Sequence, residues 1–142
     1  MLKHFLKRED SSPLGENMNI RIYYEDTDAG GIVYHSNYLN YCERARSEHF
    51  FAQNILPHEG EGSGFVVHHI DASFLATSML GDMLEVRTTL LKSRHTSVTL
   101  RQTIYKEETS VFSMEVVLVY LNRGKPAKIP LRLREAFEGF SA

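Results

Sequence analysis

The stretch YYEDTDAGGIVYHSNYLNY, from Tyr23 to Tyr41, decides how this chain of 142 residues can fold. Its first half contains two aspartates and a Gly-Gly pair, which are typical of a tight turn. Its second half starts a helical pattern that predicts a helix from Asn37 to Asn54, with Ser36 or Asn37 as the N-cap. The positions expected to face the core of that helix are Tyr38, Tyr41, Cys42, Ala45, His49 and Ala52.

Strand-like segments lie on both sides of this stretch. A short one precedes it, from Ile20 to Tyr24, and four long ones follow, rich in β-branched and aromatic residues. Short polar segments separate the long strands and predict that hairpins join them. The long strands are predicted over Phe65–Ser73, Met83–Ser93, Ser97–Lys106 and Ser110–Asn122.

The order of these elements predicts an α+β fold. A helix between one short and four long strands favours a curved antiparallel sheet of about five strands, with the long helix on its concave face. The segment LRLREAFEG predicts a second, short helix that Gly139 closes. Residues 1–18 contain Pro13 and Gly15 and are expected to form a flexible N-terminal extension before one domain, residues 19–142.

The composition excludes several classes of protein. The net charge of −2 gives no basic excess for nucleic acid, so no such partner is expected. Cys42 is the single cysteine, which excludes an internal disulfide and favours the cytoplasm. No apolar run reaches the length that spans a bilayer, so any membrane association is expected to be peripheral.

The turn itself carries the candidate chemistry. Asp28 is followed by Gly30 and Gly31, which allow close approach of a ligand and a positive φ. The helix start that follows offers unpaired N–H groups with a partial positive charge. A carboxylate facing such donors suits attack on a carbonyl or activation of a water. His35, near the helix start, suits substrate orientation or proton transfer.

Spacing alone leaves other interpretations of the turn open. Asp-x-Asp before a helix is also typical of a capped turn without catalysis. A metal site is the third interpretation, although its ligands would lack a recognised spacing. Its candidate ligands are Asp26, Asp28, His35 and the His68–His69 pair.

The segment YYEDTDAGGIVYHSNYLNYCERARSE resembles the signature of the hotdog-fold acyl-CoA thioesterases. It is most similar to the YbgC-like branch of the 4-hydroxybenzoyl-CoA thioesterase family, which is associated with the bacterial Tol-Pal system. The resemblance covers about residues 19–134 and implies a hotdog fold and hydrolysis of acyl-CoA to a free acid and CoA in lipid metabolism. It also implies a homodimer or homotetramer with active sites between subunits, and neither a metal nor a redox cofactor.

The resemblance also implies roles for individual residues. Asp28 corresponds to the catalytic carboxylate, as nucleophile or general base, and His35 to an accessory catalytic residue. The backbone N–H of His35 is expected to polarise the thioester carbonyl, and Gly31 to allow its close approach. Tyr34 and Tyr38 are expected to contact substrate, although Tyr38 also fits a core position. Three basic residues near the hairpin and the end of the sheet are candidates for holding the CoA phosphates: Lys92, Arg94 and Lys125.

An alternative function needs no catalytic carboxylate. The same helix and groove would suit a non-catalytic partner that binds acyl-CoA or acyl carrier protein within an envelope or lipid-synthesis complex. An intact Asp28 favours the enzyme over this binder. The sequence sets neither the acyl chain length nor the choice between dimer and tetramer.

Overall fold

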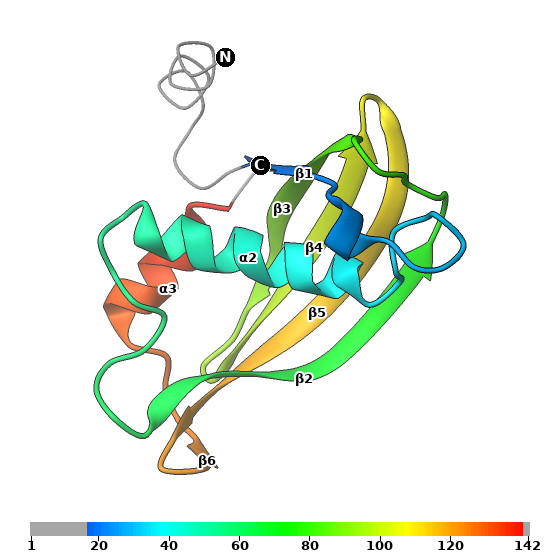
Figure 1. Ribbon diagram of the computed structural model, residues 1–142. Coiled ribbons are helices and arrows are strands. Elements are labelled where there is room, and N and C mark those ends of the chain that lie inside the picture. The colour runs from blue at the N-terminus through cyan, green and yellow to red at the C-terminus, as the bar shows by residue number, and fades with distance from the viewer. Residues whose placement is uncertain (1–16, 141–142) are drawn as a thin grey trace.

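The structure, a computed structural model, describes residues 17–140 and consists of a long helix lying across a curved antiparallel sheet (Figure 1). The predicted α+β class is confirmed, and the second and third long strands have the predicted bounds. In chain order the elements are β1 (Asn17–Arg21), the 3-10 helix η1 (Tyr24–Asp26), α2 (Asn37–Phe51), β2 (Ser63–Phe74), β3 (Met83–Ser93), β4 (Ser97–Lys106), β5 (Thr109–Asn122), β6 (Lys125–Pro126) and α3 (Leu131–Glu138).

The strand order is β1-β3-β4-β5-β2, with the short β6 paired to β5. The prediction that hairpins join all four long strands is therefore wrong for β2 and β3. Residues 75–82 form a crossover between them, and β2 pairs with β5 instead. This order places β1 and β2 at opposite edges, so that α2, which connects them in the chain, spans the concave face (Figure 1).

The first strand ends earlier than predicted. β1 ends at Arg21, whereas the sequence predicted a strand from Ile20 to Tyr24. Local side-chain bonds explain the difference, since Asp26 Oδ2 accepts the Tyr23 N–H at 2.8 Å and Thr27 Oγ1 donates to the Tyr24 carbonyl at 2.8 Å. These bonds favour the 3-10 turn η1 over a continued strand. β1 also includes Asn17 and Met18 of the expected extension; the rest, residues 1–16, lies outside the described residues.

Helix α2 begins at Asn37, as predicted, and its apolar face lies against the sheet. Five of the six predicted core positions are buried, and Phe50 is buried with them. Ala52 is the exception because the helix ends at Phe51 and Ala52 is its C-cap. Alternate residues of β3, β4 and β5 meet this face, among them Val86, Leu100, Phe112 and Val116.

Gly139 ends α3 as predicted, but for a different physical reason. A helix-closing glycine usually takes a left-handed conformation, whereas Gly139 has φ −64°. A Cβ at this position would lie 3.1 Å from Cε1 of the buried His49. The glycine therefore provides space for the ring of His49 and not conformational freedom.

Candidate active site

The loop between η1 and α2 forms a small, tight hairpin. Thr27 and Val33 form an isolated antiparallel bridge. Inside it, the Asp28 N–H donates to the Ile32 carbonyl, and the Gly31 N–H donates to the Asp28 carbonyl, both at 2.9 Å. Gly31 has φ +82°, a left-handed conformation that side-chain-bearing residues rarely adopt. The turn thus fixes Asp28 at the start of its tip.

The Asp28 carboxylate is exposed at the rim of an open depression of about 490 Å³. Its Oδ1 accepts the Gly30 N–H at 2.8 Å, while Oδ2 has no partner among residues 17–140. A Cβ at Gly30 would lie 3.2 Å from Oδ1, so a side chain at this position would require the carboxylate to shift by a few tenths of an ångström. One carboxylate oxygen is thus held by the loop and the other is open. The depression is lined by Tyr24, Thr27, Asp28, Ala29, Gly31 and Leu80.

Asp26 organises the loop and does not face the depression. Its carbonyl accepts the Tyr34 N–H at 3.0 Å and the Asn37 side-chain amide at 2.9 Å. Through these bonds one residue joins η1 to the start of α2. Burial, with the nearby charge of the Asp26 carboxylate, raises the pKa of the underlying Tyr41, which keeps its phenol neutral.

The start of α2 leaves two backbone donors open. Among the described residues, the N–H groups of His35 and Ser36 have no acceptor. Ser36 occupies the predicted N-cap position, but its side chain makes no cap bond and its backbone is helical, with φ −71° and ψ −15°. The next N–H groups are bonded, since Asn37 donates to the Tyr34 carbonyl at 2.9 Å. Open donors followed by a helix suit a developing negative charge.

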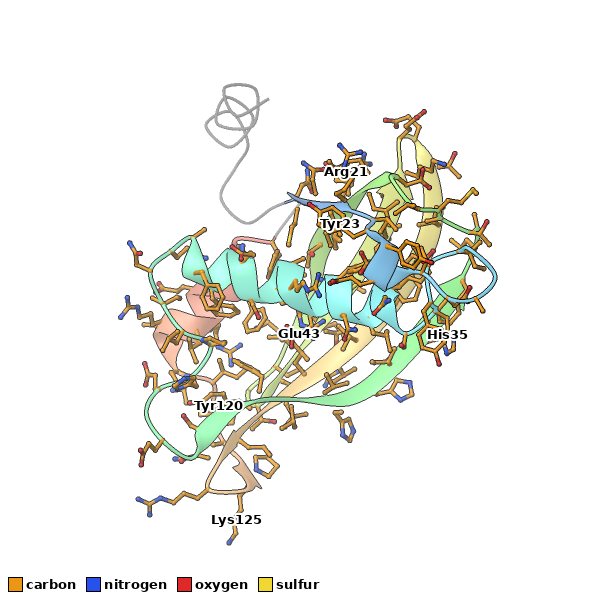
Figure 2. All side chains as sticks on the ribbon, in the orientation of Figure 1. Arg21, Tyr23, His35, Glu43, Tyr120 and Lys125 are labelled. Carbon is orange, nitrogen blue, oxygen red and sulfur yellow. The ribbon has the colours of Figure 1, made fainter. Side chains whose placement is uncertain are left out.

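His35 lies at the same end of the molecule, beside the end of β2 (Figure 2). Its exposed ring lies 4.6 Å from Tyr34 and 6.0 Å from Phe74, centroid to centroid. No hydrogen bond joins His35 to Asp28 within the described part of the chain. The structure therefore brings both residues to one end of α2 without forming a dyad.

The other predicted substrate contacts are not all gathered there. Tyr34 is exposed, as contact with substrate requires, whereas Tyr38 is only 3% exposed and packs on Phe112 in the core. Lys92 and Arg94 are exposed at the far end of β3, whose first residue, Met83, pairs with Arg21 beside the loop. At about 3.3 Å per residue, Lys92 lies roughly 30 Å along the strand from Met83. One protomer does not bring these cations to its own Asp28.

The sequence did not single out some residues that support the site. Ser78, in the crossover, contacts both the loop and α2, yet it is one of several polar residues in a segment without periodicity. Leu80 and Tyr24 line the depression. Concerning the metal interpretation, residues 17–140 contain no cluster of three His, Cys, Asp or Glu side chains able to hold an ion, and both His68 and His69 are exposed.

Comparison with known proteins gives consistent matches. The profile of the thioesterase superfamily matches residues 30–113, which include the loop from Gly30 onward and α2 but not Asp28. The acyl-CoA thioesterase YbgC of Helicobacter pylori is 44% identical over 129 residues, covering 83% of this chain and 96% of the relative. The acyl-CoA thioester hydrolase YbgC of Escherichia coli O157:H7 is 37% identical over 126 residues, covering 84% and 92%. Among solved structures, a probable thioesterase from Bartonella henselae superposes with a TM-score of 0.75 at 29% identity, covering 80% of this chain and 98% of that one.

Proposed function

Because this chain belongs to the thioesterase superfamily, as a YbgC-like thioester hydrolase of the hotdog fold, we propose that it hydrolyses acyl-CoA with Asp28 as its catalytic carboxylate. One observation carries the assignment. The exposed Asp28 carboxylate, with one oxygen held by the Gly30 N–H and the other open, stands at the rim of a depression in the loop that leads to the open donors of α2.

In the proposed reaction the thioester carbonyl oxygen accepts the His35 N–H, which we place as the oxyanion donor together with the Ser36 N–H. Negative charge that develops on this oxygen is stabilised by donors already oriented before reaction. Either the Asp28 carboxylate attacks the carbonyl carbon, or it takes a proton from a water that attacks. The C–S bond then breaks, and CoA leaves as a thiolate that takes up a proton. The exposed ring of His35 suits orientation of the substrate or transfer of that proton.

Isotope labelling and trapping of an intermediate together distinguish the two roles of Asp28. As a nucleophile it forms a mixed anhydride, and water then attacks this intermediate. A single turnover in H₂¹⁸O places label in the product acid by either route when water attacks the acyl carbon. Attack at the carboxylate carbon of Asp28 instead leaves the label in the protein. Trapping of the anhydride by hydroxylamine, with mass spectrometry of the peptide containing Asp28, identifies the nucleophilic route.

We also propose that the enzyme works as a homo-oligomer in which two copies pair through β2. β2 is an edge strand whose Val66 and Val67 are 43% and 49% exposed, and such an edge is suited to pairing with a second copy. His35 lies beside Phe74 at one end of β2, and this strand of 12 residues is roughly 36 Å long. Antiparallel pairing about its centre would bring each catalytic loop to the opposite end of the neighbouring copy.

That opposite end has the features that the catalytic loop lacks. A cavity of about 360 Å³ lies between α2 and the start of β2, with Phe50, Phe65 and Phe137 among its lining residues. Polar side chains also line the cavity, namely Glu43, Arg46, Ser47 and His58. We place the acyl group there, because a mostly apolar, partly enclosed site suits an acyl chain. Lys92 and Arg94 lie towards the same end of the sheet as β6, where Figure 2 labels Lys125. We propose that Lys92 and Arg94 bind the phosphates of the CoA whose thioester lies at Asp28 of the partner subunit.

The first test is a turnover assay on a series of acyl-CoA substrates with a thiol reagent that detects free CoA. We expect Asp28→Asn to lower kcat by more than about 10³-fold, as expected for loss of a catalytic group, with an unchanged circular dichroism spectrum. Glu25→Gln is the matched control, since Glu25 is an exposed carboxylate of the neighbouring η1. Wild-type kcat in Asp28→Asn would refute the assignment, and no CoA release with any chain length would favour the alternative, a non-catalytic binder.

The second test is subunit complementation. A 1:1 mixture of Asp28→Asn with the double variant Lys92→Ala/Arg94→Ala, unfolded and refolded together, forms mixed dimers in half of the cases. If each site combines Asp28 of one copy with the cations of the other, each mixed dimer contains one intact site, and about one quarter of the wild-type activity at low substrate returns. Activity no higher than the sum of the separately refolded variants would contradict the shared site.

The cellular setting of the reaction is a further set of proposals. Residues 17–140 contain no helix long and apolar enough to cross a membrane. We expect the enzyme in the cytoplasm, with at most peripheral contact with the inner membrane, and acyl carrier protein and the Tol-Pal system as candidate partners. Fractionation of cells and affinity capture with the Asp28→Asn variant, which should hold substrate-bearing partners longer, test these expectations.

A further inference from the structure

Ser78 lies in the crossover between β2 and β3 and is fully buried, with 0% of its surface exposed. It makes two hydrogen bonds to the catalytic end of the chain. Its carbonyl accepts the Val33 N–H at 2.8 Å, and its Oγ accepts the phenol O–H of Tyr38 at 3.1 Å. A residue far away in sequence thus contacts both the hairpin that carries Asp28 and the first turn of α2.

These two bonds lie on either side of the open donors. Val33 precedes His35, and Tyr38 follows Ser36, so the short segment with the unbonded N–H groups is held at both ends by one residue. The ring of Tyr38 is itself fixed, since it stacks on Phe112 with centroids 5.4 Å apart and an interplanar angle of 12°.

Ser78 is an anchor because the crossover is tied down independently of α2. At its start, the N–H groups of Leu75 and Ala76 donate to the Val111 carbonyl at 2.9 and 3.1 Å. At its end, Asp82 Oδ2 accepts the Met79 N–H at 2.8 Å and lies 3.1 Å from Nζ of Lys106. The sheet therefore holds the crossover, and the crossover in turn holds the start of the helix.

We infer that Ser78 is a positioning residue for the hydrolysis reaction: through Val33 and the Tyr38 hydroxyl it fixes the His35 and Ser36 N–H groups where they meet the substrate oxygen. The inference rests on the proposed function, because it requires those two groups to be the oxyanion donors. Donors act efficiently only when they are already in place, and small displacements far from the reacting atoms can lower the rate strongly. The effect should therefore appear in kcat and leave KM nearly unchanged.

The test is a double-mutant cycle on the Tyr38–Ser78 hydrogen bond. We expect Ser78→Ala and Tyr38→Phe each to lower kcat about tenfold, less than the roughly 10²–10³-fold cost of deleting an oxyanion donor, because the N–H groups remain present. The double variant Tyr38→Phe/Ser78→Ala should be no slower than either single variant, since all three lack the same bond. KM should change less than twofold in each.

The controls separate positioning from stability and from failure of the proposed function. Ser113→Ala removes a hydroxyl pair of similar length, 3.0 Å to Thr103, on the sheet face away from α2, and should leave kcat unchanged. Rates are measured well below the melting temperature of each variant. Wild-type kcat in both single variants overturns the inference, as does a loss of rate in Ser113→Ala equal to theirs. Asp28→Asn is measured in parallel, because its wild-type activity would overturn the proposed function itself.

Discussion

Substitutions at two glycines with nearly identical φ angles should distinguish an effect on activity from an effect on stability. Gly31, in the hairpin that carries Asp28, has φ +82°, and Gly124, in the turn between β5 and β6, has φ +81°. A Cβ added at either position meets no atom within 4 Å, so neither substitution gains or loses packing. The left-handed backbone costs an alanine about 1–2 kcal/mol at each position. Gly31→Ala and Gly124→Ala should therefore destabilise the protein by the same amount.

The expected activities differ. Strain at Gly31 is relieved by rotation of the turn that holds Asp28, since the Gly31 N–H donates to the Asp28 carbonyl at 2.9 Å. A carboxylate displaced by about 1 Å from its productive position can lose about 10²-fold in rate, so we expect kcat to fall between tenfold and about a hundredfold. Gly124→Ala should stay within about twofold of wild type.

Thermal unfolding and steady-state hydrolysis of one acyl-CoA measure both effects on the same samples. A loss of about 1–2 kcal/mol corresponds to a fall in Tm of roughly 3–7 °C for a domain of this size. The reasoning is refuted if Gly31→Ala unfolds like Gly124→Ala and also turns over like it. Equal activities would mean that the hairpin conformation does not position Asp28.

Three further predictions concern buried and charged groups. Gln102 is fully buried; its side chain accepts a hydrogen bond from the half-buried Arg46 guanidinium at 2.8 Å and donates one to the Cys42 carbonyl at 2.9 Å. Gln102→Leu should therefore lower the free energy of unfolding, measured in urea, by about 2–4 kcal/mol. A loss below about 1 kcal/mol would contradict this prediction. Burial raises the pKa of the Cys42 thiol to about 12 despite the opposing charge of Arg46, so iodoacetamide at pH 8 should label the unfolded chain and not the folded one, as mass spectrometry can show. Burial alone would raise the pKa of Asp82, but the Met79 N–H and the Lys106 ammonium together hold this pKa below its usual value. The stability that the wild type has over Asp82→Asn should therefore be full above about pH 4 and disappear as the pH falls through the lowered pKa. If the difference in unfolding free energy between the two proteins grew on acidification, the lowered pKa of Asp82 would be disproved.

The elements of this fold follow from local patterns, which is why most of their bounds were predictable. A period of three and four residues placed the start of α2 at Asn37, and alternation placed β3 and β4. The pairing of the strands was not predictable in this way, because it depends on the edge of the sheet to which each strand is added. The crossover before β3 looked like a hairpin in sequence, and only the opposite placement of β1 and β2 explains its path.

The site divides in the same way between local and distant contributions. Asp28, Gly31 and His35 belong to one contiguous segment, so a single stretch of sequence, through its resemblance to the thioesterase signature, was enough to propose them. Ser78 was not identifiable, because its role depends on a contact with Tyr38 across 40 positions of the chain. Lys92 and Arg94 were proposed for their charge near a hairpin at the end of the sheet, and neither property shows that this end lies away from their own Asp28.

The start of α2 explains why such distant support is needed. An N-cap residue normally has an extended backbone and a side chain that bonds the first helical N–H groups, and losing such a cap costs about 1 kcal/mol. Ser36 has a helical backbone with ψ −15° and makes no cap bond. The chain thus lacks local stabilisation at this position, while the Asn37 side chain bonds the Asp26 carbonyl and the Tyr38 hydroxyl bonds Ser78. A helix start held by tertiary bonds instead of its own cap can remain ordered and still keep its first donors open for a substrate oxygen.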